Sequence, residues 1–323
     1  MTDHIANFKK IKQIVSNGHV GMFILKTTSS LKPDKMRDLF RVTVDGELPQ
    51  HFRDLARKKM DWLINDPDLS VVEFFSDSAR DRIIWTLTDM EVIPVLPPVL
   101  ARIKQGSHVP TIPSFNETAL EKLQSYAIEI KNDKERIIYF RKYGKGSKIS
   151  STGLALLLKK GKFNKLDGDV FKFDNTIDCV YYEWDGQIGL YIINRDYFES
   201  IFSFYEVYKE ESAAAQSILE SSNLISITKG LFESIIEKRR YAKKIALINK
   251  KGNFDQIDLQ KIQTLMVKAH NVFKFTIKDK KIIITDREAL KDFLDVCEKH
   301  ILADPFDENQ LFRVKNMERL SEN

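Results

Sequence analysis

The sequence predicts an α+β fold with an N-terminal α/β part, a central and mostly antiparallel sheet, and a helical C-terminal part that carries one hairpin. Three observations predict this class. Helices and strands alternate in the first third of the chain, short strand-like segments joined by tight turns fill the middle, and helical periodicity returns from residue 196. The chain has 323 residues, of which 43% are hydrophobic, and this length is typical of about two domains.

Residues 1–113 are predicted to form an N-terminal α/β domain. Apolar side chains at three- and four-residue spacing predict helices over 3–16 and 50–64, which end at Asn-Gly and Asn-Asp-Pro sequences. Alternating or β-branched runs predict strands at 20–26, 40–44, 71–75 and 83–87. Five of the nine prolines fall between residues 94 and 113, so this segment is the expected boundary with the next domain.

Residues 114–323 are predicted to form the second domain, which begins with a short helix behind a capping box at Ser114 and Glu117. A sheet is expected within 126–193, because its segments follow one another through turns such as Asn132-Asp133 and Asp185-Gly186. The expected strands are 126–130, 136–141, 170–173, 177–182 and 188–193.

The region 196–323 is predicted to be mainly helical. From Phe198 to Leu219, aromatic and then small residues recur at alternating spacings of three and four, which predicts one long helix. Its stripe either packs inside its own domain or forms the seam of a dimer. The remaining expected elements are helices at 232–248 and 256–269, a hairpin of 273–277 with 281–284, and a helix from a capping box at Thr285 and Glu288 to Ile301.

Positive charge is concentrated in two segments, which we call the first basic tract (131–165) and the second basic tract (237–251). The first contains eleven Lys or Arg against two acidic residues, a net +9, and the second contains seven against one, a net +6. The whole chain carries +5, so the remainder carries −10. A neutral-to-acidic body with concentrated basic tracts is typical of a protein that binds polyanions. Alternatively, both tracts are solvated faces offset by acidic neighbours in space.

Like charges lie four residues apart on the helix predicted for the second basic tract, in the pairs Arg239 with Lys243 and Arg240 with Lys244. Such pairs repel each other by a few tenths of a kcal/mol, and a bound anion would relieve the repulsion. The alternative is that Glu233 and Glu237, one or two turns earlier, offset the cations.

The first basic tract contains the sequence Tyr-Gly-Lys-Gly-Ser-Lys at 143–148, directly after a predicted strand. Lysines and backbone N–H groups in a short glycine-containing loop can contact phosphates. Lys142, Lys145 and Lys148 are therefore candidate contacts, although the segment fits an exposed flexible loop better than a dedicated phosphate-binding loop.

Motifs for catalysis or metal binding are weak, and we expect no catalytic residue, metal or cofactor. The histidines lack zinc-ligand spacing, there is no phosphate-binding glycine motif, and Cys179 and Cys297 fall in apolar patterns typical of core residues. A metal-dependent nuclease would have to use Asp178, Glu183 or Asp169, but strand alternation places Asp178 and Glu183 on opposite faces. The sequence shows neither a signal peptide nor a membrane-spanning run, so a cytoplasmic protein is expected.

Several segments between residues 126 and 320 resemble the KwaB-like family of the two-gene Kiwa anti-phage system. The matching segments are Ile-Tyr-Phe-Arg-Lys-Tyr at 138–143, Asp-Val-Phe-Lys-Phe-Asp at 169–174, Ile-Asp-Cys-Val at 177–180, Tyr-Ile-Ile-Asn at 191–194, Phe-Glu-Ser-Ile-Phe-Ser-Phe-Tyr at 198–205 and Leu-Phe-Arg-Val-Lys at 311–315. The resemblance implies a soluble protein that binds phage DNA, assembles with the membrane protein KwaA at the inner membrane, and interferes with the phage.

The combined expectation is a non-catalytic effector that binds double-stranded phage DNA, blocks its replication or expression, and forms a homodimer. The residues expected to grip phosphates are Lys142, Lys145, Lys148, Arg239, Arg240, Lys243 and Lys244. Two alternatives stay open. One is the metal-dependent nuclease, and the other is a structural adaptor whose basic tracts face anionic lipid or an acidic surface of KwaA.

Overall fold

The computed structural model describes most of the chain in two compact units. The described residues are 3–26, 39–75, 82–111, 123–143, 148–149, 155–159, 162–166, 170–171, 175–269, 272–298, 301–303 and 311–313. Unit 1 comprises Met1–Phe74 and Arg82–Ser203, and unit 2 comprises Phe75–Asp81 and Phe204–Asn323. A mostly antiparallel sheet in unit 1 and a largely helical unit 2 confirm the α+β class.

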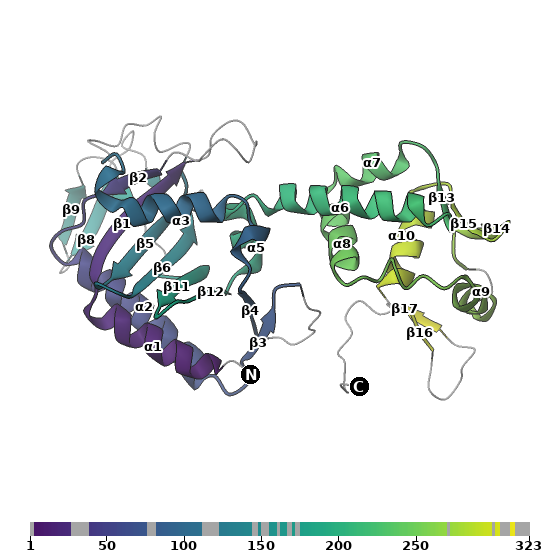
Figure 1. The fold of residues 1–323 in the computed structure, drawn as a ribbon. Coiled ribbons are helices and arrows are strands. Elements are labelled where there is room, and N and C mark those ends of the chain that lie inside the picture. Colours follow the sequence, from purple (N-terminus) through teal and green to yellow (C-terminus); the bar gives the residue numbers. More distant parts are fainter. Residues whose placement is uncertain are drawn as a thin grey trace. The chain divides into compact units, whose positions relative to one another are not determined.

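Unit 1 is built around one large sheet, drawn in Figure 1. In the described part of the chain this sheet has eight strands in the order β2-β1-β5-β6-β11-β12-β4-β3. All neighbours are antiparallel except β3 and β4, which run parallel. The strands are β1 (His19–Lys26), β2 (Leu39–Val42), β3 (Ser70–Glu73), β4 (Ile83–Leu87), β5 (Leu123–Lys131), β6 (Arg136–Lys142), β11 (Cys179–Trp184) and β12 (Gln187–Ile192).

Strands from before and after residue 113 belong to this one sheet. β1 pairs with β5 along its length, from His19 opposite Lys131 to Lys26 opposite Leu123. Backbone hydrogen bonds therefore join the two expected domains into a single core, and the division between compact units lies at Ser203 instead. Proline content alone does not mark such a division, because it says nothing about which strands pair across it.

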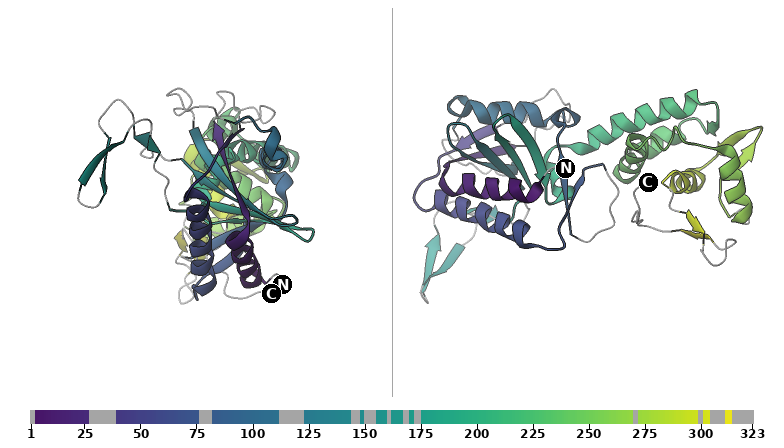
Figure 2. Two further views of the ribbon diagram at one scale, coloured as in Figure 1. Left: turned by 90° about the vertical axis from the view of Figure 1, so that its left-hand side faces the viewer. Right: turned by 60° about the horizontal axis from the view of Figure 1, so that its bottom comes forward.

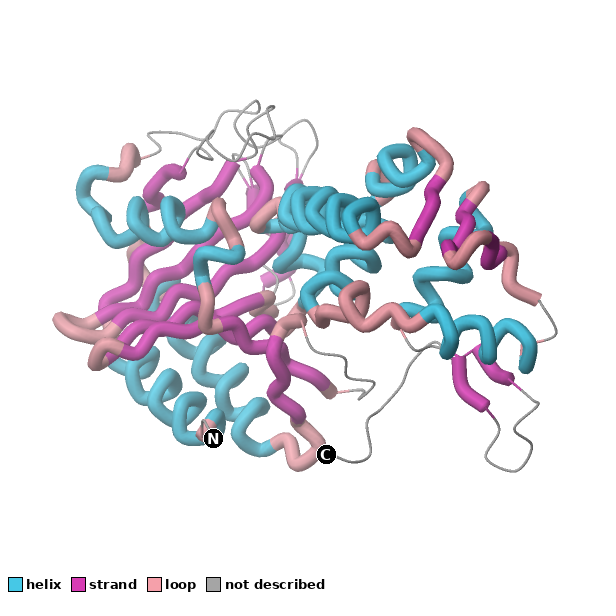
Figure 3. Tube along the Cα trace, turned by 45° about the vertical axis from the view of Figure 1, so that its right-hand side comes forward, coloured by secondary structure: helices cyan, strands magenta, loops and turns pink. Residues whose placement is uncertain are grey.

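Helices cover both faces of the sheet, as Figures 2 and 3 show. α1 (His4–Asn17) and α2 (Leu48–Asn65), both close to their predicted ranges, share one core cluster with Tyr126, Ile128 and Ile130 of β5. The intervening residues of β5 point to the other face because side chains alternate along a strand. That face carries α3 (Leu96–Gln105) and α5 (Arg195–Ile201), and Phe202, directly after α5, packs edge-on against Phe140 of β6.

α3 lies inside the proline-rich segment that the sequence suggested as a boundary. Pro97 and Pro98 fall in its first turn, where the missing N–H has no intrahelical acceptor to lose. The buried residues Leu96, Val99, Leu100 and Ile103 then hold the helix on the sheet. The prolines thus begin a helix here and do not exclude one.

The long helix predicted from Phe198 to Leu219 is wrong, because the chain breaks into α5 and α6 (Phe204–Ser221). Ser203, between the two helices, has a φ of +51°, which ends the first helix and redirects the chain. Phe198 and Phe202 pack in unit 1, whereas Tyr208, Ala215 and Leu219 are buried within unit 2. The stripe on α6 is thus covered inside its own unit, as the first interpretation of the periodicity expected.

Unit 2, in its described part, packs α6, four further helices and a three-stranded sheet around one core. Its helices besides α6 are α7 (Leu231–Ile236), α8 (Arg239–Lys250), α9 (Leu259–Lys268) and α10 (Arg287–Cys297). A small sheet has the order β13-β15-β14, formed by β13 (Ile225–Ile227), β15 (Lys281–Ile284) and β14 (Thr276–Lys278). α6 lies against α8, where the hydroxyl of Ser212 is 2.9 Å from the carbonyl oxygen of Ala242.

Several local expectations need correction or lie outside the described residues. The helix predicted at 232–248 is two helices, α7 and α8, with a break at Glu237 and Lys238. α10 is capped by Asp286, whose carboxylate accepts from the N–H groups of Glu288 and Ala289, and not by Thr285. The capping box expected at Ser114 lies outside the described residues.

Short strand pairs complete the described chain. They are β7 (Lys148–Ile149) with β10 (Val170–Phe171), β8 (Ala155–Lys159) with β9 (Lys162–Leu166), and β16 (Ile301–Ala303) with β17 (Leu311–Arg313). Within the described part of the chain, every helix is too short or too polar to cross a lipid bilayer.

Candidate nucleic-acid interface

The second basic tract begins at the N-terminal end of α8. The extended residue Lys238 precedes the helix, and Lys238, Arg239 and Arg240 are exposed one after another. The first turn contains no acidic residue, and no side chain caps it. Cations at a helix N-terminus oppose the helix dipole, whereas a bound phosphate at that position is favourable. This turn is therefore better suited to a complex with an anion than to the free protein.

Lys238 was not among the predicted contacts. The sequence placed it in the middle of a continuous helix, and the break after α7 is what brings it to the start of α8. Lys243, one turn after Arg239, is half-buried and lies 6.0 Å from the ring of Tyr208 on α6. The opposite side of α8 is buried in the core of unit 2, so Lys238, Arg239, Arg240 and Lys243 gather on its outer side.

Lys244 differs from the exposed side chain that the sequence led us to expect. Its ammonium lies 2.5 Å from a carboxylate oxygen of Asp295 and 2.7 Å from one of Glu298, and the side chain is only 19% exposed. Asp295 belongs to α10, and Glu298 follows that helix. Lys244 therefore connects α8 to α10 within unit 2, although the sequence spacing made it equivalent to Lys243.

We expect Lys244→Gln to lower the free energy of unfolding by about 2 kcal/mol, because it removes charge-assisted hydrogen bonds and leaves two carboxylates side by side. Denaturation in urea checks this, with Lys243→Gln as the matched control on the same helix. DNA affinity of the Lys244 variant should stay within about twofold of the wild-type value, since Lys244 already pairs with two carboxylates and salt screens its remaining effect on a distant phosphate. A large loss of affinity with unchanged stability would show that Lys244 contacts DNA directly.

The acidic residues proposed to offset the second basic tract have partners on α6. Both carboxylate oxygens of Glu237 accept from the ammonium of Lys209, at 2.7 and 2.9 Å, and this hydrogen bond raises the pKa of Lys209. Glu233 accepts from the amide of Gln216 at 3.1 Å. On one continuous helix, Glu233 and Glu237 would offset the cations one or two turns later. The break between α7 and α8 removes that alignment, and both carboxylates contact α6 instead.

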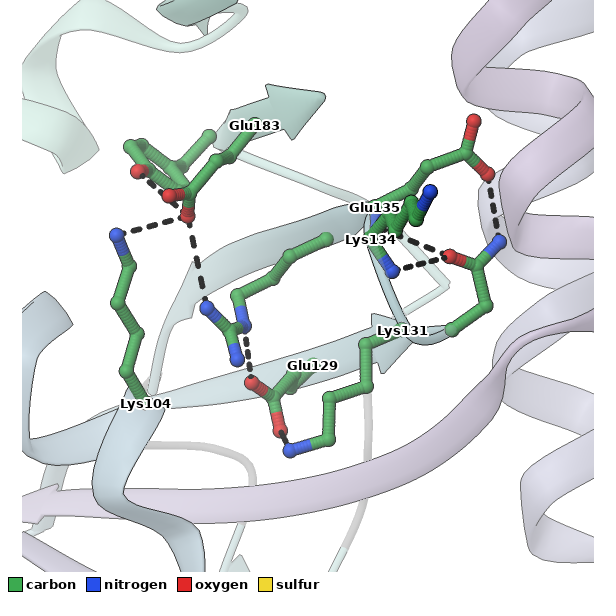
Figure 4. A network of polar contacts seen from close by, with 9 residues as sticks. Lys104, Glu129, Lys131, Lys134, Glu135 and Glu183 are labelled. Carbon is green, nitrogen blue, oxygen red and sulfur yellow. Dashed lines mark hydrogen bonds and ion pairs between the residues drawn. The ribbon is translucent and has the colours of Figure 1, made fainter. Parts of the chain in front are cut away.

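The start of the first basic tract lies in the polar network of Figure 4. Glu129, which is 3% exposed, pairs with Arg136 at 2.7 Å and with Lys131 at 3.1 Å. Arg136 also lies 3.5 Å from Glu183, which accepts from Lys104 of α3 at 2.7 Å. Burial disfavours the charge of Glu183, but the hydrogen bonds and the charge of Lys104 outweigh it, so its pKa is lowered. At the start of the first basic tract, therefore, the positive charges of Lys131 and Arg136 are offset by carboxylates that lie beside them in space.

The other end of β6 has a different arrangement around Asp178. This carboxylate is 1% exposed, accepts from the guanidinium of Arg141 at 2.6 Å, and accepts from the backbone N–H of Lys142 at 2.7 Å. Burial raises the pKa of Asp178, and the hydrogen bond from Lys142 and the charge of Arg141 act against the rise. Asp178 thereby fixes the strand end that carries both cations.

Arg141 and Lys142 both lie over the ring of Tyr197, at 5.0 and 5.4 Å from its centroid. Tyr197 is 38% exposed, and its backbone N–H is held by the side chain of Asn194, which caps α5. An exposed ring beside a lysine suits contact with nucleic acid, since bases stack on rings and phosphates pair with ammonium groups. Sequence reasoning missed Tyr197, because only the fold brings it to Lys142.

The remaining predicted contacts are described in part or not at all. Lys145 lies outside the described residues, and Lys148 is described only as a backbone position of β7, opposite Phe171. Lys142 belongs to unit 1, whereas Arg239, Arg240 and Lys243 lie together in the first turns of α8 in unit 2.

Two of the carboxylates considered for a nuclease, Asp178 and Glu183, lie at opposite ends of β11. Asp178 pairs with Arg141, Glu183 pairs with Lys104, and Asp169 lies outside the described residues. Among the residues that the structure describes, no three His, Cys, Asp or Glu side chains are grouped to hold a metal ion. Cys179 and Cys297 are buried, and burial raises the pKa of both thiols.

Comparison with known proteins gives a family for the chain. The family described as Kiwa protein KwaB-like matches residues 120–304, which is more than half of the sequence. Neither a curated protein nor a solved structure matches the chain. The matched range runs from β5 to β16, so it includes the Asp178 strand end, α8 and α10. The chain therefore belongs to the KwaB-like family and is a component of the Kiwa anti-phage defence system.

Proposed function

We propose that this chain is the DNA-binding component of its Kiwa system and that it holds duplex DNA by phosphate contacts. The observation that carries the proposal is the start of α8, where Lys238, Arg239 and Arg240 are exposed in succession, and where the first turn itself contains no acidic residue and no capping side chain. Phosphates are the abundant anions that suit such a turn, because they accept from arginine and from helix N-terminal N–H groups together.

Contacts of this kind position a protein on DNA without reading its sequence. Arg239, Arg240 and Lys243 would supply them in unit 2, and Lys142 beside Tyr197 would supply them in unit 1. We therefore expect binding to phage DNA of any sequence, with a steep dependence on salt. Such binding would block replication or expression by occupying the duplex.

The proposal includes binding without cleavage and assembly with the membrane protein KwaA, which would bring the protein to the inner membrane. The carboxylates of Asp178 and Glu183 already accept hydrogen bonds from cations, and this supports a structural role for both. A homodimer stays a prediction. The stripe of α6 that suggested a dimer seam packs against α8 within unit 2, so a dimer would need another surface.

The experiment is a retardation assay of the full-length protein on double-stranded DNA, with and without Mg²⁺. A shift in both conditions with intact DNA supports the proposal. Mg²⁺-dependent cleavage would replace it with the nuclease. No shift, together with co-purification of KwaA, would replace it with the adaptor.

Within unit 1, we expect Lys142→Glu to lower the affinity for duplex DNA by about eightfold at 0.1 M salt, the value of one phosphate contact. Fluorescence anisotropy of a labelled duplex measures the change. Lys9→Glu is the matched control, because Lys9 is an exposed lysine of α1 in the same unit. Equal losses for the two variants would mean that only net charge matters and that Lys142 makes no contact.

A further inference from the structure

A pocket of about 340 Å³ lies in unit 1 between α2 and the residues that lead into β11. Its volume falls in the range of small-ligand sites, roughly 300–1,000 Å³. The residues used below are His51, Lys58, Lys59 and Trp62 of α2, and Asn175 and Thr176 on the other side. The four residues of α2 lie on one face of that helix, since the spacings from His51 to Trp62 follow the helical period.

Trp62 gives this pocket an aromatic wall. Its side chain is 47% exposed, whereas Trp184 is buried and Trp85 is half-buried in the sheet. A large ring that the core does not use, placed at the edge of a pocket, is a surface on which another flat ring can stack.

Two lysines give the same pocket its charge. The ammonium of Lys59 lies 3.9 Å from the centroid of the Trp62 ring, and Lys58 beside it is exposed. Burial lowers the pKa of Lys59. The carboxylate in the lining, Asp54, accepts from Arg57 at 2.7 Å and from Gln50 at 2.9 Å. Among the described residues, neither Lys58 nor Lys59 has an ion pair, so the pocket offers its positive charge to an outside anion.

We propose that this pocket binds one unpaired nucleotide, with its base stacked on Trp62 and its phosphate held by Lys58 and Lys59. The amide of Asn175, the hydroxyl of Thr176 and the imidazole of His51 supply the donors and acceptors that a base or sugar edge requires. Bases inside a duplex are already stacked and paired, so the ligand is either a free nucleotide or a nucleotide at an open strand end. The site is independent of the phosphate contacts proposed for α8, which belong to unit 2.

The test uses the full-length protein with four probes: adenosine monophosphate, inorganic phosphate, a short single-stranded oligonucleotide and poly-glutamate. We expect saturable quenching of tryptophan fluorescence by adenosine monophosphate or by the oligonucleotide. Trp62→Phe should abolish the quenching, because it removes the exposed indole. In equilibrium dialysis, Trp62→Ala should weaken binding by at least about fivefold, the value of one base stacked on a ring, and Trp62→Phe should restore part of it.

The variant Lys59→Gln should weaken nucleotide binding by about tenfold or more, while Lys9→Gln, an exposed lysine on α1, should leave it unchanged. Tighter binding of adenosine monophosphate than of the oligonucleotide would identify a free nucleotide as the ligand, and the reverse would identify a strand end. The proposal is overturned if inorganic phosphate or poly-glutamate binds as tightly as the nucleotide, or if Trp62→Ala and Lys59→Gln both fold and bind unchanged. The duplex affinity of α8 variants tests the proposed DNA contacts separately, so failure of one proposal does not decide the other.

Discussion

Changing Arg239, Arg240 and Lys243 together to Glu is expected to lower the affinity for duplex DNA by about 500-fold at 0.1 M salt. Each phosphate contact gives a log–log salt slope of about −0.9, so three contacts contribute about 2.7 decades between 0.1 M and 1 M salt. The slope of the triple variant should be shallower by the same 2.7. Anisotropy titrations over a range of salt concentrations measure both quantities.

The same variant should be at least as stable as the wild-type protein. Arg239 and Arg240 occupy the first turn of α8, and negative charge is favourable there, by about 0.3–1 kcal/mol per residue. We therefore expect the midpoint of urea denaturation to stay or to rise while DNA binding falls. A loss of DNA binding that accompanies a gain in stability cannot result from unfolding. It would show that these cations destabilise the helix in the free protein and stabilise the complex with DNA.

The matched control reverses Lys278, Lys280 and Lys281 at the β14–β15 turn, three exposed lysines of the same unit. It changes the net charge by the same amount, so any general electrostatic effect appears in both variants. We expect the control to lose less than about tenfold in affinity and to keep its salt slope, because distant charges are screened beyond about 10 Å at 0.1 M salt. Equal losses in the two triple variants would remove α8 as the contact surface.

Local signals in the sequence were sufficient for much of unit 1. The hairpin of β5 and β6 was predicted with its turn at Asn132-Asp133, because β-branched and aromatic residues lie on both sides of a turn sequence. α1 and α2 followed from helical periodicity in the same way. The sequence did not predict which strands pair with one another in the sheet. Nothing between residues 19 and 131 indicates that β1 lies beside β5, and this pairing decides where the compact units divide.

The candidate site shows the same limit. The spacing of the second basic tract made Lys243 and Lys244 equivalent, and only the packing of α10 against α8 brings Asp295 and Glu298 to one of them. Periodicity also could not detect the breaks at Ser203 and Lys238, because the apolar spacing continues through both. The break at Lys238 matters most, since it turns a mid-helix cluster of cations into the start of a helix.

Asp178→Ala should be strongly destabilising, at about 3–5 kcal/mol of unfolding free energy, because it leaves the guanidinium of Arg141, whose side chain is only 11% exposed, without this carboxylate. The backbone of Asp178 would be less affected. Its carbonyl oxygen accepts from the N–H groups of Ile193 and Asn194, at 2.8 and 2.9 Å, and alanine keeps that oxygen. The loss would therefore come from the side chain, which joins β6 to the start of β11.

Glu183→Gln is the matched control for this change, since Glu183 is the other carboxylate considered for a nuclease and also pairs with cations. Its side chain is 29% exposed, and a pair of that exposure contributes about 1 kcal/mol or less. Urea denaturation of the two variants with and without Mg²⁺ separates the roles of the carboxylates. For a structural Asp178, Mg²⁺ leaves every midpoint unchanged and only the Asp178 variant is strongly destabilised. If Mg²⁺ stabilises the wild-type protein and neither variant, the two carboxylates bind the metal, and the nuclease becomes the better interpretation.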